Sequence, residues 1–203
     1  MNSKLCILIL AAGASRRMQK VKQLLPWGKT SLVRHVVSNA LATKSRSTFI
    51  VLGAFHQKIT DEIRGEKVSI LLNEHHELGI SSSIAVGVSG ILKKEQPSGI
   101  LIMLSDQPFI SSDYLDEMID AFKKKNKGIV STDYGDKIGV PAVFGAEYFQ
   151  ELQHLTGDKG AAQLISASIN EGIALKAGKA VQDIDTIEDY LKHRPADSPN
   201  MNF

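Results

Sequence analysis

A run of small residues followed by positive charges stands near the start of the chain. Residues 11–15 read Ala-Ala-Gly-Ala-Ser, and Arg16, Arg17, Lys20 and Lys22 follow them. Side chains this small let backbone N–H groups approach an anion closely, and the positive charges can neutralise it. This segment is predicted to hold a polyphosphate. A basic surface loop is the alternative.

Neither of the two common glycine-rich phosphate motifs fits this segment. The dinucleotide fingerprint requires G-x-G-x-x-G, whereas only Gly13 is present. The P-loop requires a glycine five residues before its G-K-[ST] triplet, but Gln23 stands there before Gly28-Lys29-Thr30. The GKT triplet is therefore predicted to form a turn that leads into a helix N-cap. An NAD-dependent oxidoreductase is disfavoured.

A second candidate for chemistry is a carboxylate that follows an apolar run. Asp106 comes just after residues 99–104, at the place where a parallel sheet presents its ligand-binding residues. Magnesium needs only one or two carboxylates when phosphate oxygens and water complete its coordination. The alternative is that Asp106 caps the turn before Pro108.

The elements that must position these residues alternate between strands and helices. Runs that are apolar on successive residues predict strands covered on both faces, whereas 32–41 and 115–122 have helical spacing. The alternation predicts a single-domain three-layer α/β/α fold with a Rossmann-like, mostly parallel sheet. Helix starts are expected at Thr30 or Ser31, at Ser81 or Ser82, within 111–113 and at Thr186. The predicted strands are 5–10, 47–53, 68–72, 99–104, 128–132 and 139–144.

The 203 residues suffice for one domain, expected over 1–194, and the polar tail 195–203 is expected to be disordered or a docking arm. The net charge of +2 is too small to indicate nucleic acid. No apolar run approaches the roughly 18 residues that a membrane span needs, so no membrane partner is expected. The single cysteine, Cys6, is interpreted as a small buried hydrophobe, and the cytoplasm is the expected location.

Two further segments carry polar side chains that could bind a ligand. In GISSSI, Gly79, Ser81 and Ser82 can hold a ribose or base, or form an ordinary helix cap. The segment TGDKG at 156–160 can form an anion-binding helix start or a plain surface turn. The adjacent His75 and His76 cannot easily converge on one metal ion, so a transition-metal site is disfavoured.

Several motifs in order resemble one family of nucleotidyltransferases. The segment 10–37, LAAGASRRMQKVKQLLPWGKTSLVRHVV, resembles the N-terminal signature of the molybdenum cofactor nucleotidylyltransferase family, within the nucleotide-diphospho-sugar transferase type of fold. Later motifs agree in order and spacing over nearly the whole chain. They are NEHHELGISSSIAVGV (73–88), LIMLSDQPFIS (101–111), GVPAVF (139–144), LTGDKGA (155–161) and DIDTIEDY (183–190).

This resemblance implies a reaction at phosphorus. In such enzymes a phosphate monoester attacks the α-phosphorus of a nucleoside triphosphate, and pyrophosphate leaves. The nucleophile is already anionic, so alignment and charge neutralisation supply the catalysis. The cytidylyl members are the most similar, because guanylyl members typically have Leu-x-Gly-Gly where this chain has Leu10-Ala11-Ala12-Gly13. CTP, a molybdopterin-type acceptor, Mg²⁺ and a downstream molybdoenzyme are the implied partners.

The resemblance also assigns residues. It implies that the catalytic residues are Lys22, Arg16 and Asp106. It also implies that Asp106 and Asp185 bind Mg²⁺. Asp183 is interpreted as structural, and an N-cap role is the alternative for Asp185. The nucleotide-binding residues are Leu10, Ala11, Ala12, Gly13, Ala14, Ser15, Arg16, Lys22, Ser81 and Ser82. The acceptor-binding residues are Gly79, Ser82, Gln107, Pro141, Asp158 and Lys159.

Three positions depart from the family pattern. Gln19 replaces a frequent glycine, Val140 a frequent histidine and Ala162 a frequent arginine. The last two belong to the acceptor side, so two alternatives stay open. One is a non-catalytic nucleotide- or cofactor-binding chaperone for a molybdoenzyme. The other is a nucleotidyltransferase that acts on a sugar or alditol phosphate.

Overall fold

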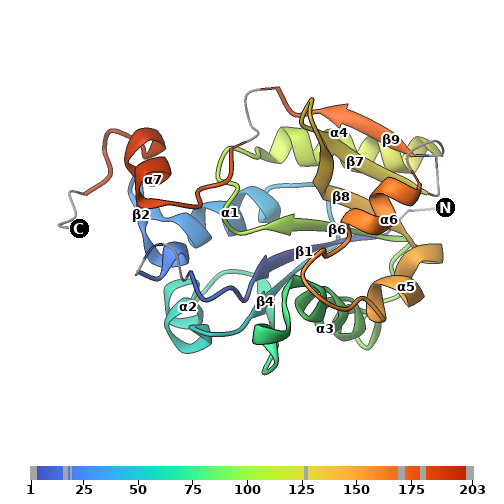
Figure 1. Ribbon diagram of the computed structural model, residues 1–203, viewed down its shortest axis with the longest axis horizontal. Coiled ribbons are helices and arrows are strands. Elements are labelled where there is room, and N and C mark those ends of the chain that lie inside the picture. The colour runs from blue at the N-terminus through green and yellow to red at the C-terminus, as the bar shows by residue number, and fades with distance from the viewer. Residues whose placement is uncertain are drawn as a thin grey trace.

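A sheet of seven strands runs through the middle of the molecule (Figure 1). The computed structural model describes residues 4–15, 18, 20–125, 128–168, 172–178 and 182–199. Along the sheet the strand order is β5-β4-β1-β6-β8-β7-β9, and β8 is antiparallel to both of its neighbours. The strands are β1 (Leu5–Ala11), β4 (Ser47–Leu52), β5 (Val68–Leu72), β6 (Gly99–Leu104), β7 (Ile129–Asp133), β8 (Ile138–Gly145) and β9 (Ile173–Lys176).

Helices cover both faces of this sheet. One layer holds α1 (Leu32–Leu41), α2 (His56–Glu62) and α4 (Ser112–Lys125). The other holds α3 (Ile80–Leu92), α5 (Phe149–Gln153) and α6 (Ala162–Ala167). The predicted three-layer α/β/α fold with a mostly parallel sheet is confirmed. Within the described residues, no helix has the length and apolarity needed to cross a membrane.

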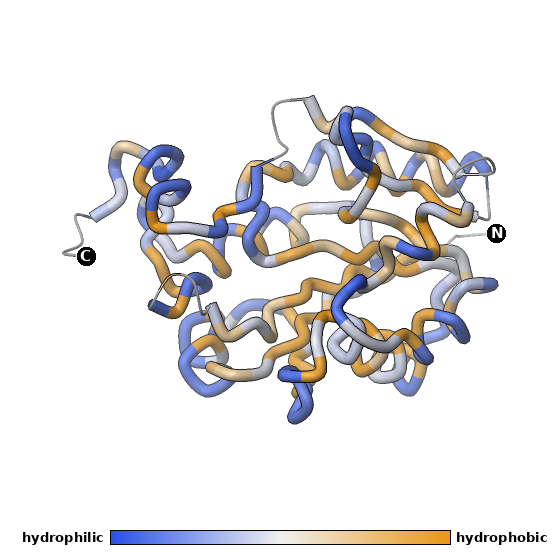
Figure 2. The backbone as a smooth tube through the Cα atoms, viewed as in Figure 1, coloured by the Kyte–Doolittle hydropathy of each residue, from blue (hydrophilic) through white to orange (hydrophobic). Residues whose placement is uncertain are grey.

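The alternation of side chains along β1 explains why its sequence is apolar without interruption. Leu5, Ile7 and Ile9 join the core formed with α1 and α4. Cys6 and Leu8 join the opposite core, beneath α3. Burial raises the pKa of the Cys6 thiol to about 12, which agrees with a buried hydrophobe rather than a nucleophile. Figure 2 shows the hydrophobic character of the central strands.

The predicted strands are all present, and most helix starts lie where expected. Ser31 caps α1 by accepting from the Arg34 N–H, and Thr186 caps α7 (Ile187–His193) in a capping box. The expected start at Ser81 or Ser82 is wrong. The cap position of α3 is Gly79, whose φ of 94° turns the chain, so these serines lie in the first turn. Strand β9 and the hairpin β2 (Pro26–Trp27) and β3 (Thr30–Ser31) were not predicted.

A third, smaller core ties the end of the chain to this hairpin. Leu25, Trp27, Ile184 and Tyr190 are buried together, and Figure 1 places α7 beside β2. The Tyr190 hydroxyl donates to the Pro26 carbonyl at 2.8 Å. The described part of the tail, 195–199, also packs here, because the Gly28 N–H donates to the buried Ser198 Oγ. The disordered tail and the docking arm both stay predictions for 195–203.

Removing the Tyr190 hydroxyl is expected to weaken this third core. Tyr190→Phe leaves the Pro26 carbonyl without its donor, so the free energy of unfolding should fall by about 1–2 kcal/mol. Urea denaturation measures this change. Tyr148→Phe is a matched control, since its partly buried hydroxyl contacts Ser168 far from α7. Unchanged stability in Tyr190→Phe would contradict the packing described.

Candidate active site

A cleft of about 470 Å³ opens at the edge of the sheet where the parallel strands end. Its walls come from residues 10–15 at the end of β1 and beyond it, and from Ser105 and Asp106 after β6. The third wall lies at the start of α3 and holds His76, Glu77, Gly79 and Ile80. Lys22, Gln23, Asp158 and Asp185 also line the cleft. The cleft therefore lies where open α/β sheets bind their ligands.

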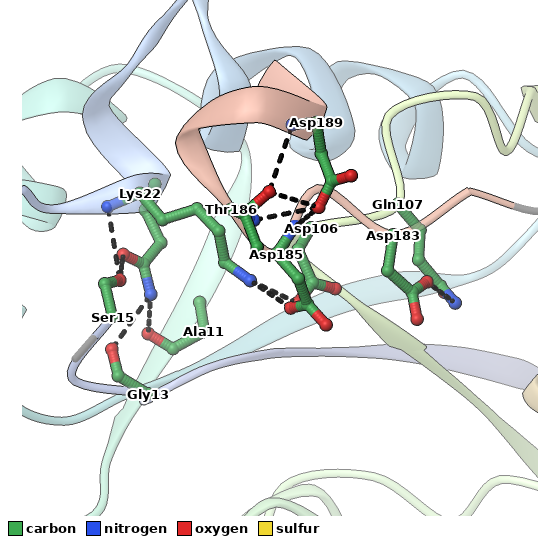
Figure 3. A network of polar contacts seen from close by, with 11 residues as sticks. Ala11, Gly13, Ser15, Lys22, Asp106, Gln107, Asp183, Asp185, Thr186 and Asp189 are labelled. Carbon is green, nitrogen blue, oxygen red and sulfur yellow. Dashed lines mark hydrogen bonds and ion pairs between the residues drawn. The ribbon is translucent and has the colours of Figure 1, made fainter. Parts of the chain in front are cut away.

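Lys22 joins two carboxylates inside this cleft (Figure 3). Its Nζ lies 2.7 Å from Asp106 Oδ2 and 3.1 Å from Asp185 Oδ1. Burial alone would lower the pKa of Lys22, but the two carboxylates outweigh burial and raise it. The ammonium therefore keeps its charge at neutral pH. The structure brings together three of the four side chains that the sequence assigned to catalysis and metal binding.

Local hydrogen bonds place the two carboxylates. The Ile184 N–H donates to the Asp106 carbonyl at 2.9 Å, which fixes the segment before α7 against the end of β6. Thr186, not Asp185, caps α7, so the N-cap alternative for Asp185 is wrong. Asp106 Oδ2 accepts from Lys22, and Oδ1 is buried with no partner among the described residues. Asp106 therefore does not cap the turn before Pro108.

The two carboxylates fit a hard divalent cation. A buried oxygen of Asp106 without a partner and the nearby Asp185 carboxylate supply the oxygen donors that Mg²⁺ or Mn²⁺ prefers. No group of three or more His, Cys, Asp or Glu suited to a metal exists among the described residues. Such a cation would be held by two protein carboxylates together with phosphate oxygens and water.

The loop 11–15 keeps its predicted place on the cleft wall. Ser15 adopts a φ of 50°, which is unusual for a residue other than glycine. Gln23, which sequence reasoning used only to reject the P-loop, lies buried beneath this loop. Its only signal in the sequence is a polar residue beside the apolar pair Leu24–Leu25. Arg16 and Gln19 lie outside the described residues.

The serines at the start of α3 have different surroundings from those expected. Ser82 Oγ accepts from Asn73 Nδ2 at 2.9 Å and contacts the carbonyls of Gly79 and His75. Ser81 is fully buried. Neither lines the cleft, whereas Ser83 does. His76 and Glu77 also line it and were not assigned to the nucleotide.

The predicted acceptor residues divide into two groups. Gly79 and Asp158 both line the cleft. They are packed so closely that a Cβ atom added to Gly79 would lie only 2.0 Å from Asp158 Oδ1. Lys159 is exposed and Pro141 is buried in β8, and neither lines the cleft. Gln107 is also buried behind it.

Gln107 holds a polar cluster next to the cleft. Its Nε2 contacts Asp183 Oδ1 at 2.9 Å, the Tyr134 hydroxyl at 3.0 Å and the Val140 carbonyl at 3.3 Å. Burial raises the pKa of Asp183, the hydrogen bond from Gln107 opposes this rise, and the charge of Asp106 adds to it. These contacts agree with the structural role predicted for Asp183.

A Rossmann-like sheet with a small-residue loop, a lysine and two carboxylates at its strand ends has the architecture of a nucleotide-binding transferase. Residues 7–172 match the MobA-like NTP transferase domain, so the chain belongs to this family of nucleotidyltransferases. Its substrate is accordingly a nucleoside triphosphate.

Similar proteins extend over nearly the whole chain. The purine catabolism protein PucB of Bacillus subtilis is 28% identical, over 90% of this chain and 92% of its own length. The crystal structure of Rv0371c from Mycobacterium tuberculosis is 27% identical with a TM-score of 0.84, over 95% of this chain and 97% of that one. A complex of Rv0371c with manganese is 26% identical with a TM-score of 0.79, over 93% and 97% of the two chains.

Because the pKa of Asp183 is raised, we expect the substitution Asp183→Asn to increase the free energy of unfolding in a pH-dependent way. Because the folded-state pKa lies above the unfolded value, the ionised carboxylate lowers stability at neutral pH, and this loss disappears as the pH falls through the folded pKa. Asn keeps an oxygen that can accept from Gln107. The variant should therefore be more stable than the wild type at pH 7, and the gain should vanish near about pH 3.

Urea denaturation at both pH values measures this difference. The exposed Asp136→Asn is the control. An Asp183→Asn variant less stable than the wild type at pH 7 would show that the ionised form is required by the fold.

Proposed function

We propose that this protein transfers CMP from CTP to the phosphate of a molybdopterin-type cofactor, with Mg²⁺, and releases pyrophosphate. The observation that carries the proposal is the contact of Lys22 with Asp106 and Asp185, beside the loop 11–15. These are the groups that a metal-bound triphosphate requires. The manganese complex of a similar protein supports the use of a divalent cation.

The reaction needs no protein base. An oxygen of the acceptor phosphate forms a bond to the α-phosphorus, and the bond from that phosphorus to the bridging oxygen of the β-phosphate breaks. Backbone N–H groups of 13–15 hold the β- and γ-phosphates, and Lys22 stabilises the negative charge that grows on the α-phosphate. Asp106 and Asp185 would hold Mg²⁺, which would neutralise phosphate charge and orient the triphosphate.

The choice of CTP and of the acceptor rests on the family pattern. Ala12 stands where guanylyl members have glycine, which supports a pyrimidine nucleotide. Gly79 and Asp158, assigned to the acceptor, line the same cleft as the phosphate loop. This arrangement supports an acceptor phosphate that reaches the α-phosphate from the side of α3.

Replacing Asp106 tests the metal role. Asp106→Asn should lower magnesium-dependent turnover by about 100-fold or more, because the amide cannot bind the cation as a carboxylate does. Pyrophosphate release from CTP and acceptor, measured over a range of Mg²⁺ concentrations, gives the result. Asp116→Asn, on the outer side of α4, is the control and should keep full activity. Full activity in Asp106→Asn would show that Asp106 is not a ligand of the catalytic metal ion.

Replacing Lys22 tests its role in the transition state. Lys22→Met should lower kcat by about 100-fold and raise KM for CTP much less, because the charge on the α-phosphate grows during the reaction. The variant should also bind Mn²⁺ more tightly in the absence of nucleotide, since the ammonium no longer competes for the carboxylates. Steady-state kinetics and Mn²⁺ titration measure the two effects.

The exposed Lys29→Met is the control for this pair of measurements. If Lys22→Met has an unchanged kcat and a raised KM, Lys22 only binds the nucleotide and does not stabilise the transition state.

A further inference from the structure

A buried amide lies beneath the phosphate loop. Gln23 is only 2% exposed and belongs to the short helix η1 (Lys22–Leu24). Its Nε2 donates to the Gly13 carbonyl at 3.1 Å and contacts the Ala11 carbonyl at 3.4 Å. Its Oε1 accepts from Ser15 Oγ at 3.1 Å. One side chain thus connects the beginning, middle and end of the loop.

Two of the other three carbonyls around the turn, those of Ala12 and Ser15, also accept hydrogen bonds from the protein. The Ala12 carbonyl accepts from the Ala54 N–H at 3.4 Å, and the Ser15 carbonyl accepts from the Met18 N–H at 3.0 Å. Together with the two bonds from Gln23, these contacts direct the negative ends of four of the five peptide groups that begin at residues 11–15 into the protein. A bound anion would therefore meet few carbonyl oxygens on this loop.

The backbone donors of the same loop are left for a ligand. Within the part of the chain that the structure describes, no backbone N–H of residues 13–15 donates a hydrogen bond to the protein. Gly13, Ala14 and Ser15 all line the cleft. Successive N–H groups at a turn with one left-handed residue, here Ser15, form an anion-binding concavity.

We propose that Gln23 is a positioning residue for the nucleotide. By holding the Gly13 carbonyl away from the cleft, it keeps the Ala14 N–H of the same peptide group turned toward the β- and γ-phosphates. Its bonds to the Ala11 carbonyl and to Ser15 Oγ fix the loop on either side, so that the neighbouring N–H groups of 13 and 15 keep their positions. This inference rests on the proposed function, because it assigns the phosphates to this loop. It explains why a polar residue occupies a buried position where a hydrophobic side chain would otherwise fit.

The same residue also couples the loop to the catalytic lysine. The Lys22 N–H donates to Ser15 Oγ at 3.2 Å, and Ser15 Oγ donates to Gln23 Oε1. Lys22 and Gln23 are neighbours in η1, so one short helix places the ammonium at the carboxylates and the amide beneath the loop. A change at Gln23 should nevertheless act mainly on phosphate binding, because the Lys22 ion pairs do not involve the amide.

Two substitutions separate this role from simple packing. Gln23→Met keeps the length and removes the hydrogen bonds, whereas Gln23→Glu keeps the shape and places a negative acceptor against the two carbonyls. Calorimetric titration with inorganic tripolyphosphate and with CTP should show a Kd weakened about tenfold or more in the first variant, and further in the second. The kcat should change less than KM, as expected for binding shared by ground and transition states.

Gln153→Met is the control, because its amide contacts Ser89 between α5 and α3, away from the cleft. A merely structural role would lower the melting temperature of Gln23→Met and leave the Kd of the folded protein unchanged, which would overturn the inference. The wild type provides a test that needs no variant. Amide hydrogen exchange of residues 13–15 should slow when tripolyphosphate binds, and unchanged exchange in the bound protein would also overturn it.

The outcomes distinguish this inference from the function on which it rests. If the wild type binds tripolyphosphate and CTP and both Gln23 variants bind them equally well, only the role of Gln23 is wrong. If the wild type binds neither compound, the proposed function fails as well.

Discussion

The ion pairs of Lys22 with Asp106 and Asp185 are the constraint on which the site depends. They join residues that lie 84 and 163 positions apart, and each comes from a segment held by separate contacts. Lys22 follows the loop after β1, Asp106 follows β6, and Asp185 precedes α7. Partly buried ion pairs add little net stability, because desolvation offsets their attraction. Their arrangement therefore indicates a site in which charges are held ready for a ligand.

The same charges suit a metal-bound triphosphate. In the free protein the ammonium pairs with one oxygen of each carboxylate. When a nucleotide binds as proposed, the carboxylates can turn to the cation and the ammonium to a phosphate, so each charge exchanges one partner for another. The third core supports this exchange, because Tyr190 and Ile184 anchor the segment that carries Asp185 to the hairpin and to β6. This arrangement agrees with the membership of the chain in the family of MobA-like NTP transferase domains.

Much of the fold could be predicted because β1 and β6 are buried on both faces, which requires apolar residues at successive positions. Lys22 and Asp106 could be placed because loops at strand ends meet at one edge of a parallel sheet. The role of Gln23 could not be predicted, because it depends on the direction in which the carbonyls of the loop point. The four-residue strand β9 alternates half-buried and exposed positions and is too short to give a clear pattern. The resemblance assigns Ser82 to the nucleotide, and nothing in the sequence shows that Asn73 binds its hydroxyl.

Calorimetric titration of CTP into the wild-type protein, with Mg²⁺ and with EDTA, tests the central claim most directly. If the loop, Lys22 and the two carboxylates form one site for a metal-bound triphosphate, CTP should bind with one-to-one stoichiometry and with much higher affinity in Mg²⁺. GTP should bind more weakly under the same conditions. Equal affinity in Mg²⁺ and in EDTA, or no binding of either nucleotide, would contradict the account.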